Sequence, residues 1–503
     1  MEIQHPSRFA RSAPDRPAVI VAGDETVLTY AELEARSNQV AHALRAFGLG
    51  IGEHVAVLMD NRAEYFEVVW GAMRAGLLVT PINRHLAPDE ADYIVKDCGA
   101  TALFASASCA HLASDVGGRR VVVGGAFPGF ESYDDVLGAQ PTSPIADECE
   151  GNWMFYSSGT TGRPKGITPP RVGGPLGAPT SFTGLVQGLY GGTESTRYLN
   201  PAPLYHAAPS GWSDAIHRLG GTVVTMAGFD PIEFLAAIER YGITLAQVVP
   251  THLVRLLKLP EAERGRFDLS SLEVLVHAAA PCPPDVKRAA IAWLGPIVYE
   301  YYSGSEGVGF CAIGPDEWLA HAGSVGRSLL GAVHILDADG NELVPRDEGE
   351  VWFETASRFQ YHGDPEKTAA AFNDRGWSSL GDMGWVDEDG YLYLTDRVSN
   401  MIISGGVNIY PREVEDALIA HPGVTDVAVI GVPDDDMGEA VRAVVQAAER
   451  PVDRDAFARE LIAFCRDRVA HYKCPSSVVF VDELPRLPTG KIARRLLPPE
   501  VRE

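Results

Sequence analysis

Three features are scarce in this sequence of 503 residues, and each scarcity excludes a class of protein. The seven cysteines form no Cys-x-x-Cys pair, which argues against a structural zinc site or a disulfide framework and favours a reducing cytoplasm. No run of five Lys or Arg occurs and the formal net charge is −25, so nucleic acid and anionic membranes are poor partners. No apolar run approaches membrane-spanning length, and the first residues lack the pattern of a signal peptide. We therefore expect a cytoplasmic protein without a transmembrane segment.

The rest of the composition is that of a globular protein, with 46% hydrophobic and 22% charged residues. The 51 glycines and 35 prolines fit many tight turns better than long helical bundles. A chain of this length predicts two to four domains.

The first 300 residues alternate between helix-like and strand-like segments. Thr29-Tyr-Ala-Glu32 is a capping box ahead of an amphipathic run to Phe47, which Gly48 closes. Asp230 and Pro231 predict the start of a second helix, which extends to Tyr241. Further helices are predicted at 62–75 and 284–294, and strands at 54–59, 101–106, 223–226, 243–249, 272–279 and 297–302. This alternation predicts mostly parallel sheets covered by helices.

Beyond residue 320 the pattern changes twice. Short strands with DADG and DEDG turns predict a small antiparallel sheet or barrel at about 320–396. A compact α+β unit follows, with helices at 411–420 and 455–469 and strands at 424–432, 441–447 and 477–481. We therefore predict an α/β fold with an N-terminal domain at 1–396, a hinge at 397–399 and a small mobile C-terminal domain at 400–503.

The segment from Tyr156 to Gly166 carries the strongest chemical signal. An apolar strand leads into small hydroxyl and glycine residues and one lysine, namely Ser157, Ser158, Gly159, Thr160, Thr161, Gly162 and Lys165. Small residues let backbone N–H groups approach a phosphate, hydroxyls add donors, and a lysine supplies a positive charge. Because glycine follows Lys165 where a Walker A loop has Ser or Thr, kinase and GTPase functions are disfavoured.

Six further segments are each weak alone but specific together. In chain order they are Pro203–Ala208, His277–Pro281, Glu300–Gly307, Trp377–Gly384, Asp396–Pro411 and Leu487–Ile492. With the phosphate-loop segment, they resemble the adenylate-forming superfamily of acyl- and aryl-CoA synthetases, luciferases and peptide-synthetase adenylation domains. The resemblance extends from about Thr29 to about Arg495.

The resemblance implies a site for ATP and Mg²⁺. Ser157 to Lys165 are expected to hold the β- and γ-phosphates, Ser305 the α-phosphate and Glu306 the magnesium ion. The residues expected to border the adenine are Ala279, Glu300, Tyr301 and Tyr302, with Tyr302 stacked on the base. The ribose hydroxyls are expected to meet Asp382 and Arg397. These cations and the metal would offset the negative charge that builds as a carboxylate approaches the α-phosphate.

The same resemblance implies a mobile C-terminal domain. Lys491 would bridge the carboxylate and the α-phosphate during adenylation and withdraw before thiol attack. Gly405, Gly406 and Tyr472 would line the tunnel for coenzyme A. Ser399 aligns with the hinge, where relatives often have Asp or Lys, so hinge behaviour can differ in this chain.

A roomy apolar pocket is expected for the acid. Its candidate lining comprises His206, Ala207, Gly211, Trp212, His277 and Gly307. His206 is also a candidate catalytic group at the junction of pocket and tunnel, and for each residue an ordinary core position is an equal alternative. The pattern favours an aromatic or a bulky, medium-to-long aliphatic acid. The resemblance also implies that an amino acid is disfavoured. Peptide-synthetase domains bind the ammonium group with an Asp beside this motif, and Tyr205-His206-Ala207 offers none.

We therefore predict an ATP- and Mg²⁺-dependent carboxylic acid–CoA ligase that forms an acyl-adenylate and releases AMP and pyrophosphate. One alternative is a ligase that loads a carrier protein, and another is a non-catalytic binding module with the same fold. CoA is favoured because the sequence ends just after Lys491 without a carrier domain. A monomer and a homodimer are both compatible with the sequence.

Overall fold

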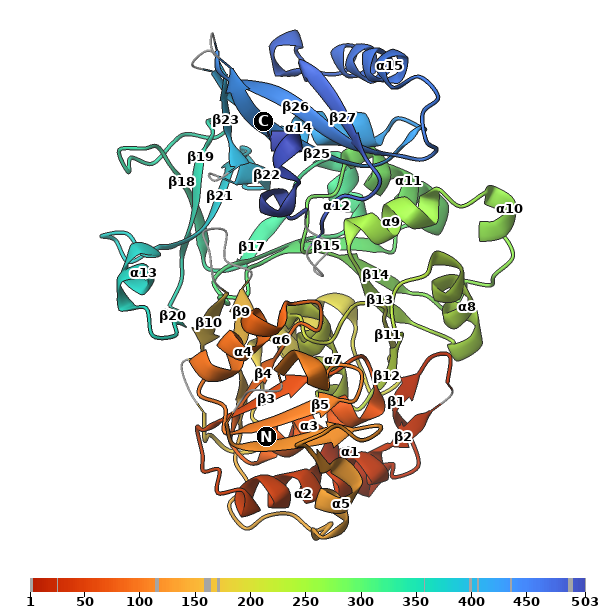
Figure 1. Cartoon of the computed structure of the whole chain (residues 1–503), viewed down its shortest axis with the longest axis vertical. Helices are drawn as coiled ribbons and strands as arrows, with labels where there is room; N and C mark the ends of the chain where they lie inside the picture. The colour runs from red at the N-terminus through yellow and green to blue at the C-terminus, as the bar shows by residue number, and fades with distance from the viewer. Residues whose placement is uncertain are drawn as a thin grey trace. The chain divides into compact units, whose positions relative to one another are not determined.

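The computed structural model describes residues 3–24, 26–113, 117–157, 164–169, 172–356, 358–397, 400–404, 407–434, 437–486 and 492–502. The chain divides into two compact units, which are described separately. Unit 1 comprises residues 1–248, 258–276 and 358–369, and unit 2 comprises residues 249–257, 277–357 and 370–503. Figure 1 labels the elements along the chain.

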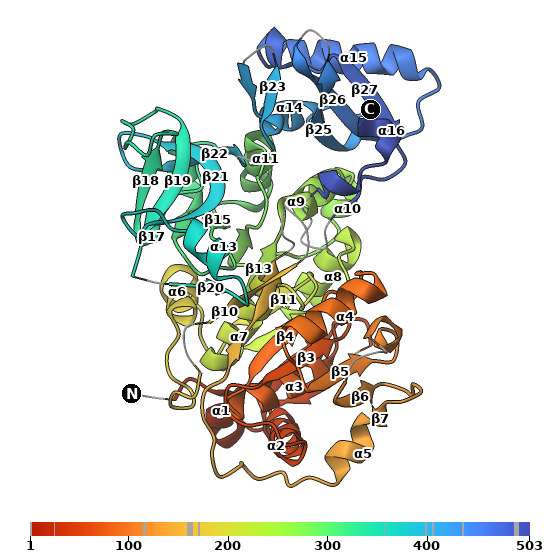
Figure 2. The same cartoon turned by 60° about the vertical axis from the view of Figure 1, so that its left-hand side comes forward.

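Unit 1 contains a six-stranded, fully parallel sheet in the order β7-β6-β5-β3-β4-β8. Its strands are β3 (His54–Leu58), β4 (Leu78–Pro81), β5 (Ala102–Ser106), β6 (Arg119–Val123), β7 (Glu131–Ser132) and β8 (Asn152–Trp153). The helix α4 (Pro88–Asp97) and the short η1 (Ala110–Ala113) bury apolar side chains of β3, β5 and β6. The helix α3 (Ala63–Arg74), which follows β3, packs along α2 (Tyr30–Ala46) (Figure 2).

A second sheet in unit 1 has the order β14-β13-β11-β12-β1-β2. Its strands are β1 (Pro17–Val21), β2 (Val27–Thr29), β11 (Arg197–Asn200), β12 (Thr222–Thr225), β13 (Leu245–Val248) and β14 (Val274–His277). The pairs β1–β12, β11–β12 and β11–β13 are parallel, and the edge pair β1–β2 is antiparallel. The helices α7 (Ala207–Leu219) and α8 (Pro231–Tyr241) connect its parallel strands.

Unit 2 contains an antiparallel strand group, β15 (Val298–Tyr302), β16 (Phe310–Ile313) and β17 (Arg327–Leu330). The helices α11 (Pro284–Leu294) and α12 (Pro315–Ala320) flank β15 and β16 in the sequence. A four-stranded antiparallel sheet follows in the order β18-β19-β21-β22. Its strands are β18 (Ala332–Leu336), β19 (Gly349–Glu354), β21 (Ser378–Val386) and β22 (Leu392–Arg397).

The C-terminal part of unit 2 is a five-stranded sheet around the long pair β25 (Val424–Asp434) and β26 (Gly438–Ala447). The remaining strands are β23 (Ile402–Ser404), β24 (Val407–Ile409) and β27 (Ser477–Val481). The helices α14 (Pro411–Ile419) and α15 (Arg454–Arg466) bury one face. Leu484, Leu497 and Val501 of the C-terminal segment pack on the opposite face, so the sheet has a core on both sides.

The predicted α/β class and most predicted elements are confirmed. The capping box is present at α2, where Thr29 accepts from the Glu32 backbone N–H and Glu32 accepts from that of Thr29. Asp230 caps α8 by accepting from the N–H groups of Ile232 and Glu233 at 2.9 and 3.0 Å. The predicted antiparallel sheet and the C-terminal α+β arrangement are also present. The predicted hinge at 397–399 stays a prediction, because residues 398 and 399 lie outside the described ranges.

All seven cysteines are buried free thiols. Of the helices within the described ranges, none combines the length and apolarity that a membrane crossing needs.

Candidate active site

In unit 1 the predicted phosphate-loop segment begins and ends on paired strands. Ser157, the last residue of β9 (Phe155–Ser157), lies directly opposite Lys165, the first residue of β10 (Lys165–Thr168). The pairing holds the two ends of the predicted loop next to each other, with the Lys165 side chain half-buried. The predicted phosphate-binding residues Ser158, Gly159, Thr160, Thr161 and Gly162 lie outside the described residues.

Gly166 shows why this hairpin needs a glycine beside the lysine. A Cβ atom at Gly166 would lie 2.4 Å from the methyl group of Met154 and 3.0 Å from the Tyr156 ring. The Tyr156 hydroxyl in turn donates to Asp97 Oδ2 at 2.6 Å. The hairpin is therefore packed and anchored up to the residue before the predicted phosphate contacts.

The candidate acyl-pocket residues of unit 1 cluster at the start of α7. His206 is the N-cap residue of this helix, and its ring contacts that of Tyr205 edge-on at 4.5 Å between centroids. Ala207 and Gly211 are four residues apart, so they share a helix face, and both are half-buried. Trp212 has no exposed surface and stacks on Tyr198. Trp212 therefore lies in the packed interior of unit 1.

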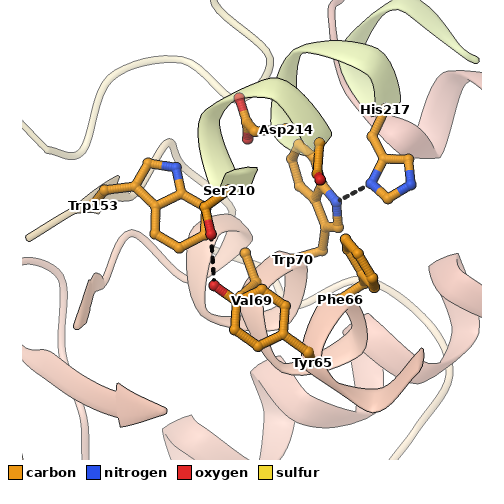
Figure 3. A pocket seen from close by; sticks show the side chains of 9 residues that line it. Tyr65, Phe66, Val69, Trp70, Trp153, Ser210, Asp214 and His217 are labelled. Carbon is orange, nitrogen blue, oxygen red and sulfur yellow. Dashed lines mark hydrogen bonds between the residues drawn. The ribbon is translucent and has the colours of Figure 1, made fainter. Parts of the chain in front are cut away.

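A cavity between α3 and α7 is too small for an acid substrate. Its volume is about 10 Å³, about what a single water molecule requires. Figure 3 shows its lining, with Ser210 pointing toward Tyr65 and His217 toward Trp70. The two hydrogen bonds measure 2.8 and 3.0 Å. This cavity belongs to the interior between the two helices.

In unit 2 the Glu300 carboxylate lies inside a buried ionic cluster. Its Oε2 atom accepts from Lys287 Nζ of α11 at 2.6 Å and lies 3.4 Å from His277 Nε2 at the end of β14. Lys287 and His277 have no exposed surface, and the Lys287 ammonium lies 4.9 Å from the Trp318 ring centroid. Burial lowers the pKa of His277 to about 4, and the nearby Glu300 only partly offsets this effect. The imidazole is therefore neutral at pH 7, and the ammonium balances the carboxylate.

Tyr302, Asp382 and Arg397 are brought together, although 95 positions separate the first from the last. The Tyr302 hydroxyl donates to Asp382 Oδ2 at 2.6 Å, and Asp382 is only 8% exposed. Asp382 on β21 lies directly opposite Arg397 on β22 in the antiparallel register. The Arg397 side chain lies outside what the structure describes.

Tyr301 faces the other side of β15 from Glu300 and Tyr302. It is 7% exposed and stacks on Phe310 at 5.1 Å between centroids, with the rings 10° from parallel. Its side chain is therefore part of the core.

A tight turn carries Ser305, Glu306 and Gly307. The Gly307 N–H donates to the carbonyl of Gly304, and Gly307 has a φ of 68°. Ser305 and Gly307 are exposed and Glu306 is half-exposed. The turn closes onto β16 through Gly309, where a Cβ would lie 2.3 Å from the Phe353 ring. The chemistry of Glu306 fits the expected Mg²⁺, which proteins often bind through one or two carboxylates together with substrate phosphates.

Ala279 has a left-handed backbone, with a φ of 74°. This conformation is strained for a residue with a Cβ, and Ala279 is exposed. Strained residues cluster at ligand sites, and this one lies in a segment predicted to border the adenine.

The remaining predicted residues belong to the C-terminal part. Tyr472 is 58% exposed and lies beside Lys473, whose ammonium pairs with Glu413 at 2.5 Å. Lys491, Ser399, Gly405 and Gly406 lie outside the described residues, so the structure does not place them.

Lys287 is not among the residues predicted from the sequence. The signal was available, because Lys287 shares the spacing of Ala290, Ile291 and Leu294 on the face of the predicted helix that turns inward. A lysine at an apolar-face position indicates a buried partner.

The chain matches two family models over most of its length. The model described as AMP-binding enzyme matches residues 7–360, and that described as AMP-binding enzyme C-terminal domain matches residues 413–491. A feruloyl-CoA synthase from Amycolatopsis sp is 36% identical over 498 residues, covering 97% of this chain and 96% of the relative. A fatty acid–[acyl-carrier-protein] ligase, ScoC of Streptomyces coeruleorubidus, is 32% identical, covering 98% of this chain and 95% of the relative.

The fold matches solved structures over the whole chain. The anthranilate CoA ligase AuaEII in complex with anthranoyl-AMP superposes with a TM-score of 0.84 at 26% identity. The match covers 99% of this chain and 96% of that structure. Together these matches confirm the predicted superfamily and fold class.

Proposed function

The chain belongs to the AMP-binding enzyme family, and on that premise we propose that it is an AMP-forming carboxylic acid–CoA ligase. It uses ATP to convert a carboxylic acid to an acyl-adenylate with release of pyrophosphate. The thiol of coenzyme A then displaces AMP and leaves an acyl-CoA. The observation that carries the proposal is the hydrogen bond between Tyr302 and Asp382, together with the pairing of Asp382 with Arg397 across two strands. All three residues are expected to contact AMP.

The residues expected to bind the phosphates lie in unit 1, and those expected to bind the adenine and ribose lie in unit 2. Within each unit, their arrangement supports the proposed role. In unit 1, the Ser157–Lys165 hairpin begins a loop suited to the β- and γ-phosphates. In unit 2, Tyr302 and Ala279 have exposed or half-exposed surface for the adenine, and Asp382 and Arg397 bind the ribose hydroxyls. Glu300 and Tyr301 shape the adenine site from within, because their side chains are buried against Lys287 and Phe310.

Magnesium would be held by Glu306 together with the phosphates of ATP, and Ser305 would contact the α-phosphate. When bound, the ion supplies positive charge to the phosphate oxygens as negative charge develops. Lys491 bridges the carboxylate and the α-phosphate in the adenylation step. Gly405, Gly406 and Tyr472 accept the pantetheine arm after the C-terminal domain rotates about Ser399.

The acid itself would be bound near His206, Ala207, Gly211 and Gly307, with Trp212 and His277 supporting the pocket from the interior. Small residues at the first turns of α7 leave room for a bulky group. Relatives that act on feruloyl, anthranilate and fatty acyl groups support an aromatic or medium-to-long aliphatic acid.

A panel of fatty, benzoic, cinnamic and polycyclic acids, assayed for AMP release with ATP, Mg²⁺ and CoA, tests the proposal. We expect at least one acid to give CoA-dependent AMP release. Lys491→Ala is the matched control, and it should abolish adenylation while still allowing thiol attack on a supplied acyl-adenylate. Equal loss of both half-reactions in this variant would contradict the domain-rotation role.

A second candidate function is the loading of a carrier protein, which the match to ScoC favours. The same assay with a phosphopantetheinylated carrier protein in place of CoA separates the two. Transfer to the carrier with none to CoA would replace the CoA proposal. Failure of every acid to stimulate AMP release or ATP–pyrophosphate exchange would overturn both.

A further inference from the structure

One side chain outside all the predicted motifs, Asn61, bonds three backbone groups near His206. Its Nδ2 group donates to the carbonyl oxygens of Ala202 and Met226 at 2.9 and 2.8 Å. Its Oδ1 atom accepts from the Leu204 N–H at 2.9 Å. Both donor hydrogens of the amide are therefore used on backbone carbonyls, and its oxygen holds the chain between them.

The position of Asn61 explains why it can reach these groups. It follows β3 and precedes α3, at the carboxyl end of a strand of the six-stranded sheet. Ala202 and Leu204 follow β11, and Met226 follows β12, at the carboxyl ends of two strands of the other sheet. A single amide thus ties the carboxyl edges of both sheets of unit 1, the edge where open α/β sheets bind ligands.

A second side chain fixes the other side of the same segment. The Tyr65 hydroxyl donates to the Leu204 carbonyl at 2.8 Å and lies 2.8 Å from Ser210 Oγ, a contact visible in Figure 3. Leu204 is 1% exposed, with its N–H held by Asn61 and its carbonyl by Tyr65 and Ser210. His206 follows two residues later and begins α7, so its place depends on how Leu204 is held.

We infer that Asn61 is a positioning residue that sets the place of His206 by holding the turn 202–206. The inference rests on the proposed function, in which His206 lies at the acyl pocket. Asn61 acts through the backbone and touches no substrate. A displacement of about 1 Å at a reacting group can cost on the order of 100-fold in rate, so a small shift of the turn is enough to matter.

The test is Asn61→Leu, which keeps the approximate shape and adds no charge. We expect kcat/KM for the best acid of the panel to fall roughly 10- to 100-fold. The KM for ATP should stay within about twofold of wild type, because within the described residues Asn61 bonds Ala202, Leu204 and Met226 and not the phosphate hairpin. Tyr65→Phe should change the same quantity in the same direction by less, because Ser210 still donates to the Leu204 carbonyl.

Asn38→Leu is the matched control in unit 1. Asn38 is 1% exposed and donates to the Thr142 carbonyl at 2.8 Å, in a part of unit 1 without predicted site residues. Both leucine variants lose buried amide hydrogen bonds, so both should lower the thermal midpoint. Only Asn61→Leu should change the kinetics toward the acid.

A double variant separates positioning from a general structural role. If Asn61 acts through His206, His206→Ala with Asn61→Leu should lose no more activity than His206→Ala alone, whereas independent effects would multiply. Three outcomes would each overturn the inference. The first is a kcat/KM for the acid within about twofold of wild type in Asn61→Leu, and the second is an equal change in the kinetic constants for the acid and for ATP. The third is a loss of activity in the double variant equal to the product of the two single losses. Should Asn61→Leu not fold, Tyr65→Phe decides by the same criteria. A wild-type protein without acid-dependent AMP release refutes the proposed function instead.

Discussion

Two segments that carry candidate residues are held by different kinds of bond. In unit 1 the turn 202–206 is fixed by neutral hydrogen bonds from Asn61 and Tyr65 to backbone groups. In unit 2 the strand β15 is fixed by a buried ion pair between Glu300 and Lys287. Both anchors come from outside the segments that the resemblance identifies.

The difference determines what each anchor contributes. A neutral hydrogen bond contributes only about 0.5–1.5 kcal/mol net, so its main effect is on geometry. A buried ion pair contributes little over an apolar pair, but removal of one partner leaves an uncompensated charge. Loss of the hydrogen bonds to the turn should therefore lower the catalytic rate more than the stability. Loss of one partner of the ion pair at β15 should mainly lower the free energy of unfolding.

The largest expected effect is that of Lys287→Met. The substitution leaves the Glu300 carboxylate buried without its ammonium partner, and the free energy of unfolding should fall by about 3–5 kcal/mol. Urea denaturation measures this loss. Because Tyr302 lies two residues further along β15, the KM for ATP should rise in the same variant.

Two variants control this experiment. Arg266→Met breaks an exposed pair with Glu263, whose side chains are 61% and 41% exposed, and should cost less than about 1 kcal/mol. Lys287→Met combined with Glu300→Leu removes both charges and should recover most of the lost stability. If Lys287→Met lowers the free energy of unfolding no more than Arg266→Met does, the buried ion pair does not stabilise β15 in the way proposed.

The sequence was sufficient where local patterns determine structure. The Thr29 capping box and the Asp230 cap predict α2 and α8, and strand–helix alternation predicts parallel sheets. The Asp382–Arg397 pairing agrees with roles that the motif order implies. These features depend on neighbours in the sequence or on the combined motifs.

The two anchors could not be predicted in the same way. Asn61 bonds backbone groups that are more than 140 positions away. Nothing in the local sequence distinguishes it from any other polar residue that follows a strand. Lys287 carries a helix-face signal, but its partner depends on how α11 packs on β15. Pairing of this kind is set by tertiary structure, which no local pattern encodes.

An intermediate effect is expected for Tyr302→Phe. This variant removes a neutral hydrogen-bond donor, the Tyr302 hydroxyl, from β15, the strand that the ion pair holds. The variant removes the 2.6 Å hydrogen bond to Asp382, at a cost of about 1–3 kcal/mol in unfolding free energy, and should raise the KM for ATP. Tyr133→Phe is matched, because its hydroxyl donates to the buried Glu67 at 2.7 Å in unit 1. Urea denaturation should show a similar loss in the free energy of unfolding for both variants. Only Tyr302→Phe should raise the KM for ATP, and a rise with Tyr133→Phe as well would show that this kinetic effect does not come from the Tyr302–Asp382 hydrogen bond.

The smallest effect, and the only one of opposite sign, is expected for Ala279→Gly. Glycine relieves the left-handed backbone strain of about 1–2 kcal/mol, and its greater freedom in the unfolded chain offsets roughly 0.5–1 kcal/mol. The free energy of unfolding should therefore stay level or rise by up to about 1.5 kcal/mol. The neighbouring Ala278→Gly lacks this relief, since Ala278 is 3% exposed without a positive φ, and should lose about 1 kcal/mol or more. Urea titration of the two variants side by side gives the comparison. A loss for Ala279→Gly equal to that for Ala278→Gly would mean that the backbone at the adenine segment stores no strain.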